Sequence, residues 1–143
     1  MVKHIVLFKF NDFSSEVEKK EKLNEIKDAL LNLLDKVEAL NSIEIGINEN
    51  PNEQFDLSLT STHDSMDKLK EYATHPDHVQ VSKDMIRQGA EYALIELSFS
   101  QLKESVIEVL KEKEIDLEDG LLVLSRKIMS SGRTVCKING ETV

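Results

Sequence analysis

The sequence lacks several features that would define its class at once. It has a single cysteine, Cys136, in 143 residues, so no internal disulfide framework can form and a reducing compartment is expected. No run of about eighteen apolar residues occurs, and the apolar start from Ile5 to Phe8 is too short for the core of a signal peptide. We therefore expect a cytoplasmic protein without a membrane-spanning segment.

Positive charge is also scarce. The chain has 18 Lys and Arg against 27 Asp and Glu, which gives a formal net charge of −9. Because affinity for a phosphate backbone depends on clustered Lys and Arg, a nucleic-acid partner is not expected. Four cations do gather near the end of the chain, and a solvated hairpin face explains them more simply than a DNA patch: Arg126, Lys127, Arg133 and Lys137.

What is present is the pattern of one globular domain over residues 1–100, followed by an appendage over residues 101–143. The composition, 40% apolar and 31% charged, is typical of a globular chain. Alternating apolar residues predict strands, and apolar residues at steps of three and four predict helices. The first domain is expected to contain a strand 1–10, helix 16–40, strands 42–47 and 55–60, helices 66–72 and 79–88, and strand 92–99.

This order, β-α-β-β-α-β, predicts the α+β class and a ferredoxin-like antiparallel sheet with its helices on one face. The first strand carries a further signal. Its second face is apolar at Ile5 and Leu7, where a face open to water would be polar. A second copy of the sheet would cover these residues, so we predict a symmetric homodimer.

The appendage is predicted to be a helix followed by a β-hairpin. Apolar spacing from Leu102 to Leu110 indicates the helix, and residues 121–128 and 134–138 alternate as strands around Ser130-Ser131-Gly132. Asn139-Gly140 is a strong signal for a type I′ turn near the end of the sequence.

The candidate site is the stretch Tyr72-Ala73-Thr74-His75-Pro76-Asp77-His78. Pro76 fixes its own φ and disfavours the helical conformation at His75, which predicts a break between two helices. At such a break the phenol of Tyr72 and the imidazole of His78 can face a cavity. Alternatively, His75 caps the broken helix, His78 bonds to the backbone, and His4 is a satisfied buried polar group.

A metal site is the less favoured interpretation of the same stretch. His75 and His78 would be ligands, with Asp77 or His63 as a third. The spacing places both imidazoles on one side only if the segment is helical, and Pro76 disturbs that register. We expect neither a metal nor another cofactor.

Residues 1 to about 82 resemble the Dabb family, the stress-responsive dimeric A/B-barrel domain. The resemblance implies a ferredoxin-like protomer and a dimer whose two sheets form a barrel. It rests on three segments: Met1-Val2-Lys3-His4-Ile5-Val6-Leu7-Phe8-Lys9-Phe10, Ser42-Ile43-Glu44-Ile45-Gly46-Ile47-Asn48 and Tyr72-Ala73-Thr74-His75-Pro76-Asp77-His78-Val79.

Most members of that family have no assigned reaction, but a few relatives are enzymes, including a plant polyketide cyclase that closes an aromatic ring by aldol condensation. In such an enzyme, by resemblance, His78 would be the general base and Tyr72 would donate a hydrogen bond to the developing enolate. His4 would orient substrate or water. All three residues stand at positions that match the family pattern.

From about Lys83 onward the chain resembles RecN, the bacterial SMC-like DNA repair ATPase. A fusion with its junction near residues 82 to 88 explains both resemblances. ATPase activity is not expected, because no G-x-x-x-x-G-K-[ST] run is present to hold a nucleotide phosphate. The segments that carry the RecN resemblance are Asp84-Met85-Ile86-Arg87-Gln88-Gly89-Ala90-Glu91, Leu94-Ile95-Glu96-Leu97-Ser98-Phe99, Leu124-Ser125-Arg126-Lys127-Ile128, Ser131-Gly132-Arg133 and Ile138-Asn139-Gly140.

Three functions follow as hypotheses. The first is a stress-responsive dimeric barrel that binds a small apolar ligand in a pocket between the sheet and the helices, with a non-functional RecN-like tail. The second is a cyclase-like enzyme that depends on His78, Tyr72 and His4. The third is a DNA-repair accessory role that depends on Arg126 and Arg133.

Overall fold

The computed structural model describes residues 1–87 and 89–142, and its centre is a seven-stranded antiparallel sheet with the strand order β2-β3-β1-β4-β5-β6-β7. The first four strands in this order form the sheet of a ferredoxin-like fold, so the α+β class is confirmed. The strands are β1 (Val2–Phe10), β2 (Ser42–Ile47), β3 (Leu57–His63), β4 (Ala90–Phe99), β5 (Leu122–Met129), β6 (Thr134–Ile138) and β7 (Glu141–Thr142).

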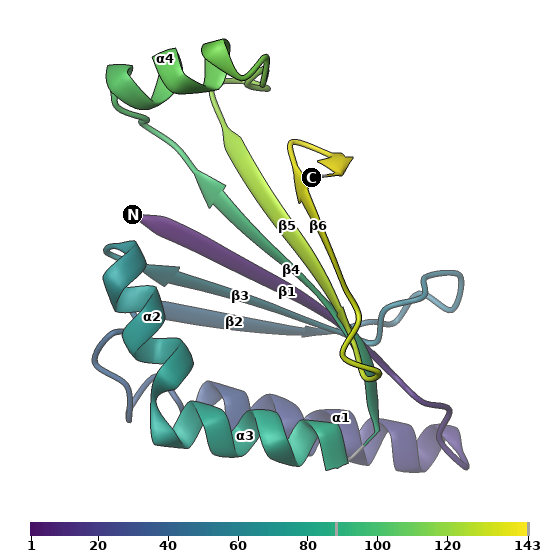
Figure 1. Ribbon diagram of the computed structural model, residues 1–143. Coiled ribbons are helices and arrows are strands. Elements are labelled where there is room, and N and C mark those ends of the chain that lie inside the picture. The colour runs from purple at the N-terminus through teal and green to yellow at the C-terminus, as the bar shows by residue number, and fades with distance from the viewer. Residues whose placement is uncertain (88, 143) are drawn as a thin grey trace.

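Three helices lie on one face of this sheet, and a fourth stands apart near the ends of β4 and β5 (Figure 1). The first three are α1 (Glu16–Leu31), α2 (Met66–Thr74) and α3 (Pro76–Arg87), and the fourth is α4 (Glu104–Glu112). Ser15 and Ser65 cap α1 and α2 through their side-chain oxygens. None of the helices in the described part of the chain is long and apolar enough to cross a membrane.

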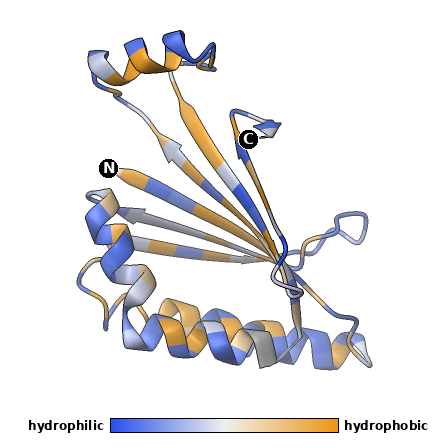
Figure 2. Cartoon of the chain, in the orientation of Figure 1, coloured by the Kyte–Doolittle hydropathy of each residue, from blue (hydrophilic) through white to orange (hydrophobic). Residues whose placement is uncertain are grey.

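The core lies between α1–α3 and the sheet. Val2, Val6 and Phe10 share one face of β1 and are buried against it, and an alternation of apolar and polar residues is visible along the strands in Figure 2. The partners of these residues come from α1, β2 and β3: Leu23, Ile26, Leu30, Ile43, Leu57 and Leu59.

Two predicted segments differ most from the structure in their bounds. The first helix ends at Leu31 rather than at residue 40, because the chain then tightens into turns such as Leu33 N–H to Leu30 C=O. These turns direct the chain into β2 while Leu33 and Val37 stay buried, so the apolar spacing continues beyond the helix. The third strand runs from Leu57 to His63 rather than over 55–60, because its pairing with β1 extends to His63.

The helix break is confirmed. His75 is the C-cap of α2 with φ −62° and ψ 135°, and α3 begins at Pro76, where a missing N–H costs no hydrogen bond. The predicted last residue of this second helix, Gln88, lies outside the described residues.

The predicted appendage is also confirmed, and it extends the sheet. β5 pairs with β4 along eight residue pairs and β6 pairs with β5, so the hairpin occupies the edge that the four-stranded sheet would otherwise leave open. Asn139 and Gly140 have φ values of 44° and 85°, as a type I′ turn requires, and the turn leads into β7.

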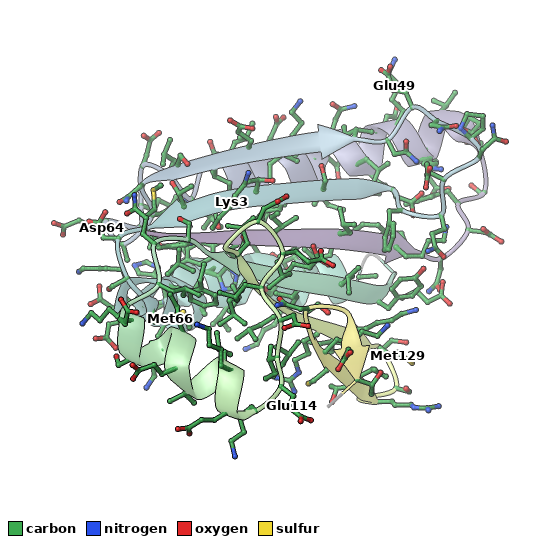
Figure 3. The ribbon with its side chains drawn as sticks, turned by 90° about the horizontal axis from the view of Figure 1, so that it is seen from above. Lys3, Glu49, Asp64, Met66, Glu114 and Met129 are labelled. Atoms are coloured by element: carbon green, nitrogen blue, oxygen red, sulfur yellow. The ribbon has the colours of Figure 1, made fainter. Side chains whose placement is uncertain are left out.

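The opposite face of the sheet carries none of α1–α3, and Figure 3 looks onto it. Ile5 and Leu7 of β1 lie on this face with Leu94 of β4, which pairs with Leu7. All three are half-buried, and Lys3, labelled in Figure 3, is exposed beside them. The chain therefore presents a sheet face with an apolar centre, as its first strand predicts.

Candidate functional site

A cavity of about 610 Å³ lies on the helical face of the sheet. Apolar side chains make up most of its lining, and a few polar groups converge on it, which is the usual composition of a small-molecule pocket. The lining residues come from α2 and α3 and from the strands β1, β4, β5 and β6 of the sheet. His4, Tyr72 and His78, the three residues predicted for the site, all line it.

The helix break sets the geometry of Tyr72 and His78. Tyr72 is in the last turn of α2 and His78 in the first turn of α3, and their rings approach to 4.4 Å between centroids. The Nδ1 of His78 donates to the carbonyl oxygen of Ala73 at 3.0 Å, since a carbonyl has no proton to give. The Nε2 of neutral His78 therefore carries a lone pair that can accept a proton.

Tyr72 is fully buried, and its hydroxyl has no hydrogen-bond partner in the described part of the chain. Burial raises the pKa of Tyr72 to about 12, so the phenol stays protonated at any physiological pH. A buried hydroxyl without a partner is costly, and a ligand oxygen in the cavity could accept a hydrogen bond from it.

A chain of hydrogen bonds through His63 and Ser61 fixes the orientation and the tautomer of His4. The Nδ1 of His63 donates to the Ala39 carbonyl oxygen at 2.9 Å, so its Nε2 must accept from the Ser61 hydroxyl at 3.0 Å. Ser61 then has only its oxygen lone pairs left for the Nδ1 of His4, 3.2 Å away, and His4 must be the donor. Like His78, His4 is left with an unprotonated Nε2.

Burial also sets the charge of these imidazoles. Desolvation, with a smaller contribution from His63 and His78, lowers the pKa of His4 to about 4. Desolvation is likewise the largest cause that lowers the pKa of His63 and of His78. At neutral pH the site thus contains three neutral imidazoles and one phenol, which together offer one free donor and two free acceptors.

His75 is not part of this group. Its Nδ1 accepts from the Asp77 N–H at 3.2 Å and lies 3.6 Å from the Asp77 carboxylate, as expected for a cap on the broken helix. Over residues 1–87 and 89–142, no group of three or more His, Cys, Asp or Glu side chains is arranged to hold a metal ion.

Sequence reasoning missed two sets of residues at the site. Ser61 is on β3 with His63, which the sequence suggested only as a possible metal ligand; neither lines the cavity, and only their place on the same strand face as the buried Leu57 and Leu59 could have indicated that they lie beside His4. The hairpin contributes a second wall that no local pattern predicts, because it depends on how β5 packs beside β4: Leu124, Ser125, Arg126, Ile128, Cys136 and Ile138.

The four cations near the end of the chain do not form one patch. Arg126 is on the cavity face of β5, while its neighbour Lys127 is on the other face, with its ammonium 4.0 Å from the centre of the Tyr92 ring. In the register of β5 and β6, Lys137 pairs with Ser125, which is two residues before Lys127 on β5. Arg133 is in the turn between those strands.

The fold and the cavity together define a ferredoxin-like α+β protein with an apolar pocket between its sheet and helices. The particular family follows from comparison: residues 2–95 match the model of Dabb, the Stress responsive A/B Barrel Domain, and the chain belongs to that family. The match continues past residue 82 and includes α3 and half of β4, so it covers part of the segment for which we predicted a resemblance to RecN. No curated protein matches the chain.

Solved structures support the same assignment. A dimeric protein of unknown function with a ferredoxin-like fold from Bacteroides fragilis is 38% identical, with a TM-score of 0.62 over 67% of this chain and 92% of that one. A Dabb family protein with a ferredoxin-like fold from Mesorhizobium loti is 20% identical, with a TM-score of 0.54 over 71% and 97%. An Arabidopsis thaliana protein is 24% identical, with a TM-score of 0.58 over 72% and 97%. The last two comparisons show the fold alone.

Proposed function

We propose that this chain forms a homodimer and binds a small, largely apolar molecule in the cavity between the sheet and α2–α3, in a stress response such as the family's description suggests. The observation that carries the proposal is the Tyr72 hydroxyl, which is fully buried at an apolar cavity and has no partner among the described residues. A ligand with one carbonyl oxygen would satisfy this donor and fill the apolar space.

The test compares two probes of the same shape, acetylnaphthalene and ethylnaphthalene, by calorimetric titration. The wild-type protein should bind the ketone more tightly, because only the ketone accepts from Tyr72. In Tyr72→Phe the affinity for the ketone should fall about three- to tenfold, the usual worth of one hydrogen bond, while the affinity for the hydrocarbon is unchanged.

Tyr92→Phe is the matched control. It also removes one phenol oxygen, but the Tyr92 hydroxyl donates to the side chain of Gln54 at 3.1 Å and Tyr92 does not line the cavity. The proposal fails if the wild-type protein binds neither probe, or if it binds both equally and Tyr72→Phe has no effect.

A cyclase-like enzyme is the second candidate, and one observation favours it. His78 is neutral, its Nδ1 is held by the Ala73 carbonyl, and its remaining nitrogen can take a proton from a carbon acid beside the Tyr72 donor. The protein should then accelerate exchange of the α-protons of acetylnaphthalene in deuterium oxide, as followed by NMR. His78→Ala should abolish the acceleration and His75→Ala should not. If the protein binds the ketone but its α-protons exchange only at the uncatalysed rate, the cyclase-like function is excluded and the binding function remains.

For the tail we propose a structural role in the sheet. Two observations support it: β5 continues the sheet along β4, and the four cations are divided between the faces of the hairpin and its turn. Binding to DNA would need these cations on one surface. The resemblance to RecN from about residue 83 stays a prediction.

A further inference from the structure

The hairpin brings a permanent cation to the cavity. In the register of the sheet, Val6 of β1 is opposite Ile95 of β4, and Ile95 is opposite Arg126 of β5. The three residues therefore form one row across the cavity face, and all three line the cavity. Arg126 is exposed and Tyr72 is fully buried, so Arg126 belongs to the solvent-facing part of the lining and Tyr72 to its buried part.

The charges around the cavity are unbalanced. No Asp or Glu is among the residues that line it in the described part of the chain. The imidazoles of His4 and His78 are neutral at pH 7, because burial lowers the pKa of both groups. Arg126 is always protonated and forms no ion pair within the described residues. Among the described residues, the cavity lining therefore has one fixed positive charge and no negative charge to oppose it.

We propose that the ligand of this pocket is an apolar carboxylic acid, whose carboxylate binds Arg126 and whose apolar body extends over Ile95 and Val6 toward Tyr72. The assignment rests on the proposed function of the pocket and adds the chemical class of its ligand. Guanidinium and carboxylate match in a planar, bidentate pair, and one guanidinium neutralises one carboxylate, whereas a phosphate monoester would keep nearly a full charge uncompensated.

The dimensions of the row agree with a ligand of this kind. β1 and β5 are separated by two strand spacings, about 10 Å, with β4 between them. An acid that reaches from Arg126 to the end of the cavity near Tyr72 must therefore have an apolar body of roughly this length. The side chains beneath it, Val6, Ile95 and Leu97, offer only carbon atoms for contact.

The test uses octanoate and octanol, which share an apolar chain and differ in the charged end, in NMR titrations at low salt. The wild-type protein should bind octanoate more tightly than octanol. Arg126→Gln should weaken octanoate binding about fivefold, a modest factor because the guanidinium is exposed to solvent, and should leave octanol binding unchanged. Arg126→Lys keeps the charge and should retain most of the preference for the acid.

Lys137→Gln is the matched control. It removes the same charge from the other face of the hairpin, so it should not change the affinity for either probe. If Arg126→Gln and Lys137→Gln weaken octanoate binding equally, the acid is attracted only by the overall positive charge of the hairpin, and the proposal is overturned. An octanoate affinity that Arg126→Gln leaves unchanged while octanol still binds would also overturn it. If neither probe binds, the pocket itself fails as a binding site, and the inference falls with it.

Discussion

Three neutral histidines, of which His63 is buried and His4 and His78 are half-buried, lie around one buried tyrosine. His4, His63 and His78 surround Tyr72 with ring centroids 4.4 to 6.4 Å from that of the phenol. Each of the three has one protonated nitrogen bonded to a fixed acceptor, and the second nitrogen of His63 accepts from Ser61. A second proton on any one of them would place a charge in an apolar pocket.

This arrangement predicts a loss of stability in mild acid. The pKa of His4 is lowered from 6.5 to about 4. Between these two values the His4 imidazole is protonated in the unfolded chain and neutral in the folded chain. Stability is therefore highest above pH 6.5 and falls as the pH drops toward 4, by about 3 kcal/mol from His4 alone. His63 and His78, whose pKa values are lowered too, change stability in the same direction.

Urea unfolding of the wild-type protein and of His4→Asn, at pH 7 and pH 4, measures the contribution of His4. The variant keeps an N–H for Ser61 but has no titrating ring, and the carboxylates titrate equally in both proteins. The free energy of unfolding should fall by about 3 kcal/mol less in the variant. Parallel curves for the two proteins would mean that His4 is already accessible to protons in the folded state.

At the scale of helices and strands, local signals predict most of the fold. Pro76 and the apolar spacing on either side of it are sufficient to predict the α2–α3 break, because the conformational restriction by proline is local. The position of β6 follows equally from its alternation and from the turn at Ser130-Ser131-Gly132.

The end of α1 could not be predicted in the same way. Leu33 and Val37 keep the helical spacing because they stay in contact with the core, although the chain between them forms turns rather than a helix. The chain leaves the helical conformation after Leu31 because it must reach the start of β2, where the Asn41 N–H donates to the Thr62 carbonyl. That requirement belongs to the tertiary structure and leaves no mark on the local pattern.

The residues of the candidate site also divide into those that local patterns predict and those that only the tertiary structure places there. Tyr72 and His78 are neighbours in the sequence, and His4 is on an alternating strand, so these three could be proposed together. Arg126 could not be, because its place at the cavity depends on which edge of the sheet β5 joins. Pairing between strands that are distant in the sequence is set by the packing of the whole sheet.

At the scale of the whole molecule, the two faces of the sheet differ. α1–α3 and the cavity occupy one face, and the other face has an apolar centre at Ile5, Leu7 and Leu94 with nothing from α1–α3 over it. Solved relatives from Bacteroides fragilis and Thermobifida fusca are described as dimeric ferredoxin-like proteins. A symmetric pairing of two such faces would remove this apolar surface from water.

Light scattering tests this pairing. The wild-type protein should have twice the mass of the 16.3 kDa chain at micromolar concentration. Leu7→Glu places a carboxylate at the centre of the open face, between Ser58 and Leu94, and should give a folded monomer because a buried unpaired charge is far costlier than an exposed one. Val17→Glu makes a comparable apolar-to-acidic change on α1, where the side chain is already 68% exposed, and should remain a dimer.

The monomer made by Leu7→Glu also separates the two faces. Because the cavity is on the far side of the sheet, the monomer should bind acetylnaphthalene as tightly as the wild-type dimer does. Loss of binding in a variant whose circular dichroism is unchanged would mean that the partner protomer completes the pocket. A wild-type protein that is itself monomeric, or a Leu7→Glu variant that still dimerises, would place the subunit contact elsewhere and leave the apolar centre of the open face without an explanation.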